Sequence, residues 1–530
     1  MKRLLLCLVA SSVVFTTACR SRVTEVEPSE SFRKAMEEVM QRQPEKYKVK
    51  PADLENRKEA VILRLSLSDA LDLAAAHNRA ILFSSLAVEL SRTTTMSSKS
   101  NLDITAGATL GYRRSESALQ TVLPGDTRSA DITATTTYGL NANLPFATGT
   151  NVALEAGFRR VDANSPFSKF EFFPSTKITL TQHLLNGVGL VPNLSNTWIA
   201  EGNERIAELN LASTRNAQAY AVAIAYWDLV EAREDFTVLK DQATLAAEAV
   251  ELAENRASAG LGTKLDVLAQ KSNLASLRRS LIQAEYLVEQ RTDELLRAIH
   301  PDLLNGYSLF TSYKVEIETL TEAENEVPED FKPSLISELK GALRKRPEIA
   351  AARKGIENAG LAITRDEYDL LPTLDLSGDF TVNGLGATAS DSFESYTDFT
   401  NLNYGFALTF GVPLQNRAAR AGLDASVIRK RQAILDAREA ETDVIMEVAA
   451  AVRGISSAIR GVLAAQEAYG FANDTHKAEV ERNKAGLATA FEVKQALNDL
   501  TAARRDLVRA RVEFEKAKLA LLKATGELGQ

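Results

Sequence analysis

The chain has 530 residues, with 62 lysines and arginines against 70 aspartates and glutamates and a formal net charge of -8. This mildly acidic balance, with no block of like charge, excludes the basic surface that nucleic-acid binding requires. Length alone would suggest about three globular domains, whereas the pattern along the chain predicts a different organisation.

The N-terminus carries the features of a secretory signal. Lys2 and Arg3 are followed by an apolar run from Leu4 to Phe15 and by small residues that end at Cys19. This order of charged, apolar and small segments predicts a signal peptide over residues 1–18, too short to cross a bilayer as a helix.

Cys19 stands at the expected cleavage point and resembles the lipidated N-terminal residue of bacterial lipoproteins. On this interpretation Cys19 is the lipidation site, residues 19–64 form a lipidated N-terminal arm, and the chain is anchored to outer-membrane lipids. The alternative is an ordinary signal peptide with an incidental cysteine. No later segment offers about 18 consecutive apolar residues, so no transmembrane helix is expected after the signal.

A phrase occurs twice in the chain, as AGLGTKLDV from Ala259 and as AGLATAFEV from Ala485. Each copy precedes a long stretch rich in alanine, leucine and arginine, which predicts a tandem duplication. The predicted units are a first repeat over 65–300, a connecting equatorial segment over 301–332, a second repeat over 333–526 and a tail over 527–530.

Each repeat is predicted to begin with a helix and to continue as β-strands. The first helix starts at Leu67 with Ser68 as its candidate N-cap. The period then changes to two, within 101–185 in the first repeat and within 373–413 in the second. Apolar residues alternate with small or polar ones, most cleanly at Leu402, Tyr404, Phe406, Leu408 and Phe410.

These segments have the length of about 9 to 11 residues that a tilted strand needs to cross a bilayer. Residues 114–130, 160–174 and 384–400 are predicted to be long polar loops, and residues 147–150 a tight turn. Long loops on one side and short turns on the other are typical of membrane β-barrels, and favour this interpretation over a half-buried soluble sheet. The strands of one chain are too few to close a barrel, so a homo-oligomer is expected.

The remaining segments predict unusually long helices. Residues 193–257 and 416–484 contain no proline, and each would reach roughly 100 Å as a helix. After each repeated turn, residues 262–300 and 488–526 carry apolar residues at heptad spacing, which indicates packing along a coiled-coil-like seam. The predicted fold class is therefore mixed α and β, a duplicated unit of long coiled-coil-like helices plus membrane β-strands.

Six phrases in this order carry a resemblance to a known family. They are LSLSDALDLAAAHNRAI at Leu65, AYWDLVEARED at Ala225, NRASAGLGTKLDVLAQ at Asn255, RKRPEIAAARKGIENAG at Arg344, YGFALTFGVPLQNRAAR at Tyr404 and RNKAGLATAFEVKQAL at Arg482. From about Leu65 to Gly526 the chain resembles the TolC-like outer-membrane efflux proteins.

The resemblance implies a homotrimer with one shared outer-membrane β-barrel, continued by an α-helical tunnel across the periplasm. It implies two partners, a periplasmic adaptor protein and an inner-membrane pump or ABC exporter, and a function as the passive exit duct of a tripartite efflux system. Two alternatives remain open, the exit duct of a type I protein-secretion system and a lipid-anchored periplasmic coiled-coil scaffold without transport.

The resemblance also implies functional residues at the two repeated turns. The adaptor-docking tips are Gly260, Leu261, Thr263 and Val267 in the first repeat and Gly486, Leu487, Thr489 and Val493 in the second. The periplasmic gate is Asp266, Glu492 and Gln495. The family often has two acidic residues spaced by three after the second tip, and Gln495 stands where the second would be, so one acidic ring is expected. Without the family, Glu492 is simply a first-turn residue that suits the helix dipole.

The first repeat departs from the family pattern because it holds four alternating segments, whereas the second repeat holds two. The extra hairpin runs from Ile132 to Phe158. A trimer would have eighteen strands if this hairpin enters the barrel, and twelve if it protrudes or lines the lumen.

The sequence offers no sign of catalysis. It lacks the GxSxG, HExxH, phosphate-loop and dinucleotide-binding motifs. Its histidines, at 77, 183, 300 and 476, have no metal-ligand spacing and are expected to be surface or packing residues. We therefore expect no enzymatic activity and no cofactor.

Overall fold

The computed structural model of the chain describes residues 61–118, 130–164, 171–260, 262–299, 315–320, 333–485 and 487–528. The predicted signal peptide, Cys19 and nearly all of the predicted arm lie outside the described residues. So do Leu261, Gly486 and most of the predicted equatorial segment.

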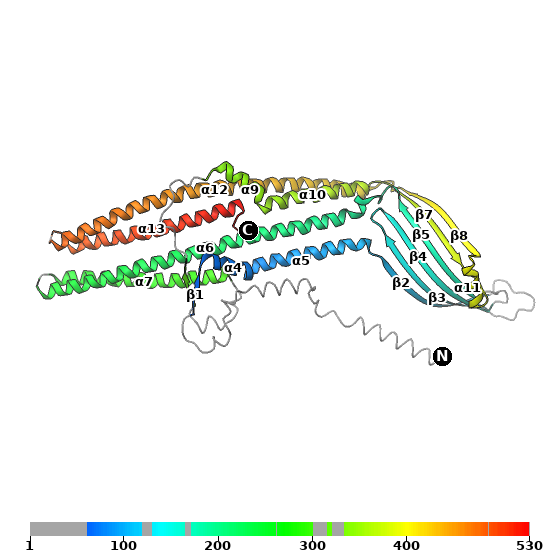
Figure 1. The fold of residues 1–530 in the computed structure, drawn as a ribbon, viewed down its shortest axis with the longest axis horizontal. Coiled ribbons are helices and arrows are strands. Elements are labelled where there is room, and N and C mark those ends of the chain that lie inside the picture. The colour runs from blue at the N-terminus through cyan, green and yellow to red at the C-terminus, as the bar shows by residue number, and fades with distance from the viewer. Residues whose placement is uncertain are drawn as a thin grey trace, which may run out of the picture.

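The two repeats follow the same order of elements along the chain (Figure 1). The first repeat comprises α4 (Leu67–His77), α5 (Arg79–Lys99), a 3-10 turn (Ser100–Leu102), β2 (Thr105–Ala118), β3 (Ala130–Pro145), β4 (Thr150–Ala163), β5 (Phe172–His183), α6 (Leu190–Ser258) and α7 (Lys264–Ile299). The second comprises α9 (Leu335–Lys345), α10 (Pro347–Tyr368), β7 (Thr373–Asn383), α11 (Ala389–Thr397), β8 (Asn401–Gly411), α12 (Arg417–Lys484) and α13 (Ala490–Thr525). Two short strands, β1 (Val61–Leu65) and β6 (Val315–Thr319), pair in parallel beside the helices.

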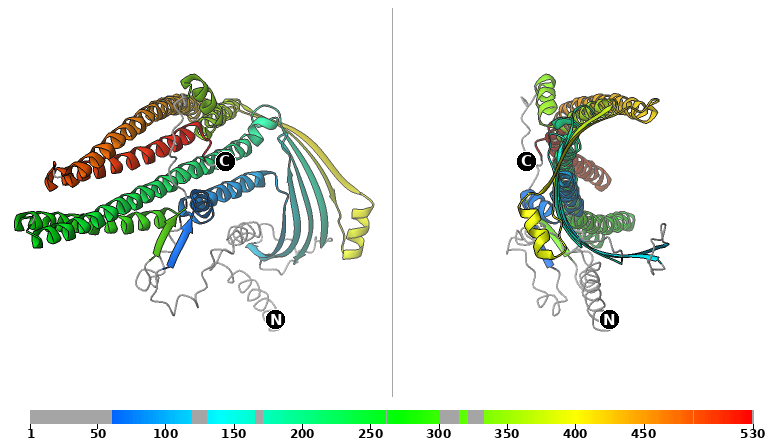
Figure 2. Two further views of the ribbon diagram at one scale, coloured as in Figure 1. Left: turned by 60° about the vertical axis from the view of Figure 1, so that its left-hand side comes forward. Right: turned by 90° about the vertical axis from the view of Figure 1, so that its right-hand side faces the viewer.

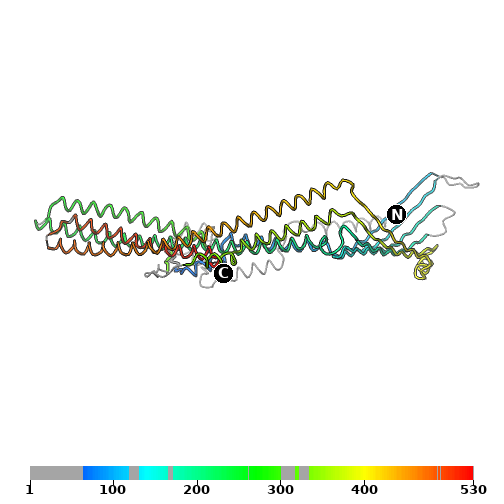
Figure 3. The backbone as a smooth tube through the Cα atoms, turned by 90° about the horizontal axis from the view of Figure 1, so that it is seen from above, coloured from blue at the N-terminus to red at the C-terminus, as the bar shows by residue number. Residues whose placement is uncertain are grey.

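The helices occupy one end of an elongated molecule and the strands the other (Figure 1). The helices α6 and α12 contain 69 and 68 residues, so each is about 100 Å long. Each folds back into a hairpin, α6 with α7 and α12 with α13, and the two hairpins lie side by side (Figures 1 and 2). Seen from above, helices and strands follow one long axis (Figure 3).

The strands form one antiparallel sheet in the order β2-β3-β4-β5-β7-β8. The sheet therefore joins strands of both repeats, through the pairing of β5 with β7. The extra hairpin of the first repeat is β3 and β4, and it lies inside the sheet between β2 and β5. Within one chain the hairpin is thus a part of the sheet.

The first helix of each repeat is broken, which corrects the expectation of one continuous helix. In the first repeat Asn78 ends α4 and its side chain accepts hydrogen bonds from the first backbone amides of α5. In the second repeat Arg346 ends α9, and α10 begins at Pro347, where proline is tolerated because a first-turn amide needs no helical partner. The N-cap of α4 is Ser66, which forms a capping box with Asp69, and not Ser68.

Two apolar clusters hold the helices together. One surrounds Tyr226 and Trp227 of α6, whose rings meet edge to face and are 0% and 2% exposed. The hydroxyl of Tyr226 donates to the backbone carbonyl of Leu65, 3.1 Å away. These residues are packing anchors of the long helix. The second cluster joins α12, α13 and α9 along an apolar stripe of α12 that includes Val448 and Ile455.

One further expectation was wrong. Residues 384–400 were predicted to be loop, but they contain the helix α11, whose N-cap Thr388 accepts from the backbone amide of Asp391. One stretch of α12 is long and apolar enough to cross a membrane by length and composition alone. Charged residues interrupt it, and Val448 and Ile455 of the same helix pack in the second apolar cluster, so the expectation of no transmembrane helix after the signal stays a prediction.

Candidate transport path

The sheet has one apolar and one polar face along its whole width. One cross-strand row consists of Ala106, Ala142, Leu154, Ile178, Phe380 and Tyr404. The adjacent row, on the opposite face, consists of Gly107, Asn141, Glu155, Lys177, Thr381 and Asn403. Because side chains alternate along a strand, this one-residue step separates a surface suited to lipid from one suited to water.

The apolar face ends at a band of aromatic residues towards the loop end of the sheet. Tyr138 is paired with Leu110 on one side and with Phe158 on the other, and the rings of Tyr138 and Phe158 lie 6.3 Å apart. One step further on the same face stands Arg160. An apolar band bounded by aromatic and then charged side chains is the pattern of a membrane interface.

Both edges of the sheet are open. Among the described residues β2 and β8 each pair on one side only. Their apolar side chains are exposed, including Leu110 (71%) on β2 and Phe406 (83%) on β8. Long unprotected edges of this kind pair with another chain. Since β2 and β8 run in opposite directions, β8 of one copy can continue the sheet onto β2 of the next.

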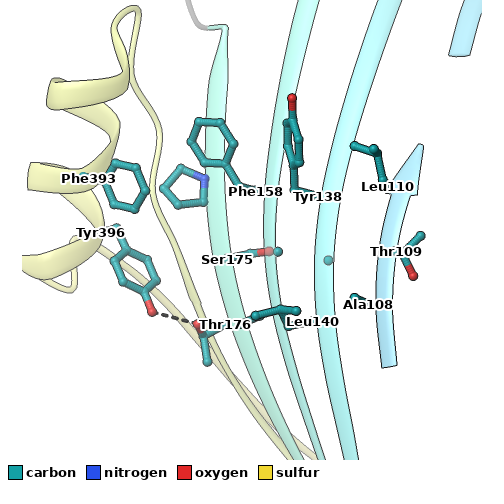
Figure 4. A pocket seen from close by; sticks show the side chains of 14 residues that line it. Ala108, Thr109, Leu110, Tyr138, Leu140, Phe158, Ser175, Thr176, Phe393 and Tyr396 are labelled. Carbon is teal, nitrogen blue, oxygen red and sulfur yellow. Dashed lines mark hydrogen bonds between the residues drawn. The ribbon is translucent and has the colours of Figure 1, made fainter. Parts of the chain in front are cut away.

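The helix α11 lies against the apolar face, on the convex side of the curved sheet (Figure 2). The ring of Phe393 stacks on Phe158 with centroids 5.6 Å apart, and the Tyr396 and Thr176 hydroxyls are 2.7 Å apart (Figure 4). Together with β2 to β5 it borders a hollow of about 520 Å³. Because α11 sits on the convex apolar face, it leaves the polar face open.

At the opposite end of the molecule the two repeated turns are built alike. The carboxylate of Asp266 accepts from the backbone amide and the hydroxyl of Thr263, at 3.0 and 2.7 Å. The carboxylate of Glu492 accepts from the same groups of Thr489, at 2.6 and 2.9 Å. In both, the threonine hydroxyl also accepts from the backbone amide of the acidic residue. Each is a capping box, which satisfies amides at the start of the returning helix.

These hydrogen bonds hold the pKa of Glu492 and of Asp266 below their ordinary values, because threonine donors stabilise the charged carboxylates. Both carboxylates are fully exposed. They are therefore charged side chains on the surface of the tips. The tips expose apolar groups as well, among them Leu265 (75%), Leu487 (72%) and Phe491 (70%). Val267 and Val493 are half-buried. Gly260 turns the first hairpin with a φ of 75°, which favours glycine.

The third predicted gate residue, Gln495, donates to Asp499 at 3.0 Å. Glu492, Gln495 and Asp499 follow one another at helical spacing of three and four residues, so they share one face of α13. Asp499 was missed in the sequence because only the residues next to the turn were considered. Helical spacing from Glu492 was the signal that could have found it.

Ion pairs tie the two helical hairpins to each other above the tips. The Arg505 guanidinium holds the carboxylate of Asp235 in a two-point contact, one bond of which is 2.6 Å. Arg504 contacts Asp241 at 3.1 Å. These pairs join α13 to α6, so the position of one tip depends on the other.

The match to a known family covers more than half of the chain. The profile of the family described as "Outer membrane efflux protein" matches residues 175–299 and 339–527.

The individual proteins that match this chain are distant from it in sequence. The chain is 24% identical to the outer membrane efflux protein BepC of Brucella suis, over 69% of this chain and 74% of BepC. It is 23% identical to protein CyaE of Bordetella pertussis, over 71% of this chain and 82% of CyaE. Among solved structures, the outer membrane protein VceC of Vibrio cholerae superimposes with a TM-score of 0.60 at 16% identity, over 87% of this chain and 96% of VceC.

Proposed function

Because the chain belongs to the outer membrane efflux protein family, we propose that three copies form one outer-membrane barrel, which their helical hairpins continue as a tunnel into the periplasm. The chain is an exit duct of the outer membrane, and the family is one of channel proteins. The observation that carries assembly into a closed barrel is the sheet with two contrasting faces and two open edges, β2 and β8. Cyclic closure pairs each β8 with the next β2 and leaves no edge.

Transport through this duct is passive, and energy comes from the partner in the inner membrane. Exit ducts of tripartite efflux systems work with a periplasmic adaptor and an inner-membrane pump. For this chain we assign the adaptor contact to the tips, at Gly260, Thr263 and Val267 and at Leu487, Thr489 and Val493. The exposed Leu487 and its neighbour Phe491 support the assignment, because apolar side chains at a helix tip suit a protein partner. Leu261 and Gly486, which flank these residues, belong to the same tips.

We assign the periplasmic gate to Asp266, Glu492 and Gln495. Around a threefold axis Glu492 forms an acidic ring, which favours cations and repels anions. Its capping role and its gate role are compatible, because the capped carboxylate remains charged and exposed. Asp499, on the same face of α13, adds a second ring about two turns beyond Glu492.

The lipid anchor is assigned to Cys19. The test is metabolic labelling with a radioactive fatty acid, on the chain and on Cys19→Ser expressed with the same signal peptide. Label on the parent and none on Cys19→Ser is expected. Equal label on both would remove the anchor from this position.

One measurement tests the assembly itself. Extracted in mild detergent and left unheated, the protein is expected to migrate as a trimer on a gel, and to shift to the monomer position after boiling. A barrel resists unfolding in this way because its strands close on themselves. A lipid-anchored scaffold of helices, the alternative of another class, would show the monomer position without heating.

A further inference from the structure

The number of strands in this sheet exceeds the number of long helices that meet it. The strands β2, β5, β7 and β8 continue into α5, α6, α10 and α12. The strands β3 and β4 continue into each other, through the turn from Phe146 to Gly149, where the Gly149 amide donates to the Phe146 carbonyl at 3.0 Å. Within the described residues, the large sheet of each chain thus has six strands above four long helices.

The turn between β3 and β4 is fixed to the base of the sheet. The Gly189 amide donates to the Thr148 carbonyl at 3.0 Å, and the His183 amide donates to the Gly149 carbonyl at 3.2 Å. A Cβ atom on Gly149 would lie 2.2 Å from the carbonyl oxygen of Gly187, which shows how closely the two backbones approach. With full ladders to β2 and β5 as well, the hairpin is a part of the wall and cannot swing into the lumen.

The circumferences of barrel and tunnel can be compared. Twelve helices from three chains, spaced by about 9 Å, form a ring of about 110 Å. Eighteen strands spaced by about 4.8 Å and tilted by about 40° need about 113 Å, whereas twelve strands need about 75 Å. At this tilt the eighteen-stranded barrel, which the ladders of β3 and β4 to their neighbours support, has about the circumference of the tunnel.

We propose that the membrane pore of this protein is an eighteen-stranded barrel about as wide as its tunnel, roughly 36 Å between backbones, and that it passes bulky hydrophilic solutes of either charge without a constriction in the membrane. The proposal rests on the trimer proposed above and adds the width and selectivity of its outer part. Selection by size then takes place at the periplasmic tips.

The lumen face of the added hairpin suits this cargo. It carries mostly small hydroxyl, amide and glycine groups, namely Thr135, Thr137, Gly139, Asn141 and Asn143 on β3 and Asn151 and Gly157 on β4, together with Ala153 and, towards the loop end, Arg159. Its Glu155 is paired across the strands with Lys177 of β5, so opposite charges stand side by side. A wall of this kind hydrates a solute without binding it tightly, and it carries charges of both signs.

The test places single cysteines at neighbouring positions of β3, one on each face. Leu140→Cys lies on the apolar face and Asn141→Cys on the polar face. The matched pair on β8, a wall strand in any closure, is Leu408→Cys and Thr409→Cys. Each variant, and the parent without an added cysteine, is treated in intact outer membranes with a charged maleimide that does not cross lipid.

If β3 belongs to the wall, Asn141→Cys and Thr409→Cys react while Leu140→Cys and Leu408→Cys are protected. Reaction at both Leu140→Cys and Asn141→Cys, with the β8 pair behaving as expected, would overturn the eighteen-stranded pore and leave the trimeric duct intact. Loss of the pattern in the β8 pair as well would instead count against the barrel of the proposed function.

The width is tested on the same variant. Polyethylene-glycol maleimides of increasing size are applied to Asn141→Cys from outside, and polymers up to about 20 Å across are expected to react. A cut-off near half of that size would correspond to a narrow pore and would overturn the proposed width. Direct imaging of the trimer by electron cryomicroscopy must also give eighteen strands, and a count of twelve would contradict the proposal.

Discussion

The carboxylate of Glu492 closes a capping box with Thr489, accepting from the threonine backbone amide at 2.6 Å and from its hydroxyl at 2.9 Å. Asp266 has the same relationship to Thr263 in the other repeat. The acidic residue at each tip therefore does two things, since it organises the first turn of the returning helix and presents a charge at the end of the molecule. Experiments on the gate have to separate these roles.

Glu492→Gln separates them. Glutamine serves the capping box as well as glutamate does, so the tip and the trimer are expected to stay intact, while the pore loses part of its preference for cations. Reversal potentials in planar bilayers under a salt gradient measure this preference. Thr489→Ala is the converse control, because it keeps the charge and weakens the cap by about 1 kcal/mol. If Glu492→Gln leaves the reversal potential unchanged, Glu492 is a capping residue only.

The pH dependence of the preference follows from the depressed pKa of Glu492. A carboxyl whose pKa is lowered on folding contributes stability that is present above its unfolded pKa and is lost as the pH falls through the folded pKa. The charge and the cap are therefore both retained from neutral pH down to the ordinary value of 4.5, and they are lost only below it. Reversal potentials are expected to be constant over the upper range and to decline in the acid range. A decline that begins near neutral pH would show either that repulsion among the three carboxylates of the ring outweighs the threonine donors or that another group titrates.

Phe406 and Ala407 give a matched test of which face of the sheet meets lipid. Phe406→Arg places a charge on the apolar face near the middle of β8, and is expected to cost about 2–4 kcal/mol if that face lies at the centre of the bilayer. Ala407→Arg faces the lumen and should cost much less. Folding into lipid vesicles from urea, followed by the gel shift on heating, measures both. Equal loss in the two variants would contradict the assignment of the faces.

Much of this fold follows from periodicity, because the period of two in β8 and the proline-free run of α12 are properties of single segments. Periodicity could not predict which strands pair with each other. Neither β3 nor β4 carries a signal for its neighbours, so the sequence left open whether the hairpin joins the sheet, which the ladders to β2 and β5 decide. The same limit applies to β1 and β6, which pair across about 250 residues.

The candidate site likewise has features that the sequence could predict and features that it could not. Glu492 and Asp266 were predictable because a capping box is local in sequence. The ion pair of Arg505 with Asp235 was not, since it depends on the register of α13 against α6, two helices that meet in the apolar cluster around Tyr226. The helix α11 was missed because its nine residues are mostly polar, and its position is set by contacts of Phe393 and Tyr396 with another repeat.

Gly386 is expected to be essential for the position of α11. A Cβ atom there would lie 2.3 Å from the backbone nitrogen of Ser392, and backbone cannot give way as a flexible side chain can. Gly386→Ala should therefore displace α11 and cost about 1–3 kcal/mol, detected as faster proteolysis at α11. Gly422→Ala, in α12 with open space around it, is the control and should be neutral or slightly stabilising. Equal protease resistance in the two variants would show that the turn absorbs the methyl group.

The contact of Arg505 with Asp235 is expected to limit how far the tips separate. Arg505 is on α13 and Asp235 on α6, so the pair links the two hairpins, and nearer the tips Arg504 repeats the link to Asp241. Both pairs are partly exposed, and the coupling energy of each should be no more than about 1 kcal/mol. Their effect is therefore sought in gating and not in overall stability.

Arg505→Ala should loosen the tips and raise the passive entry of a large hydrophilic dye into cells that lack the inner-membrane pump, and the further change Arg504→Ala should raise it more. The charge exchange of Asp235→Arg with Arg505→Asp restores an ion pair of opposite direction between the same helices, and should return dye entry towards the parent level. Trimer migration on unheated gels is the control for assembly. Because the exchange restores attraction without restoring the original residues, recovery can come only from the link itself, and a double exchange as leaky as Arg505→Ala alone would refute a role of this pair in holding the tips.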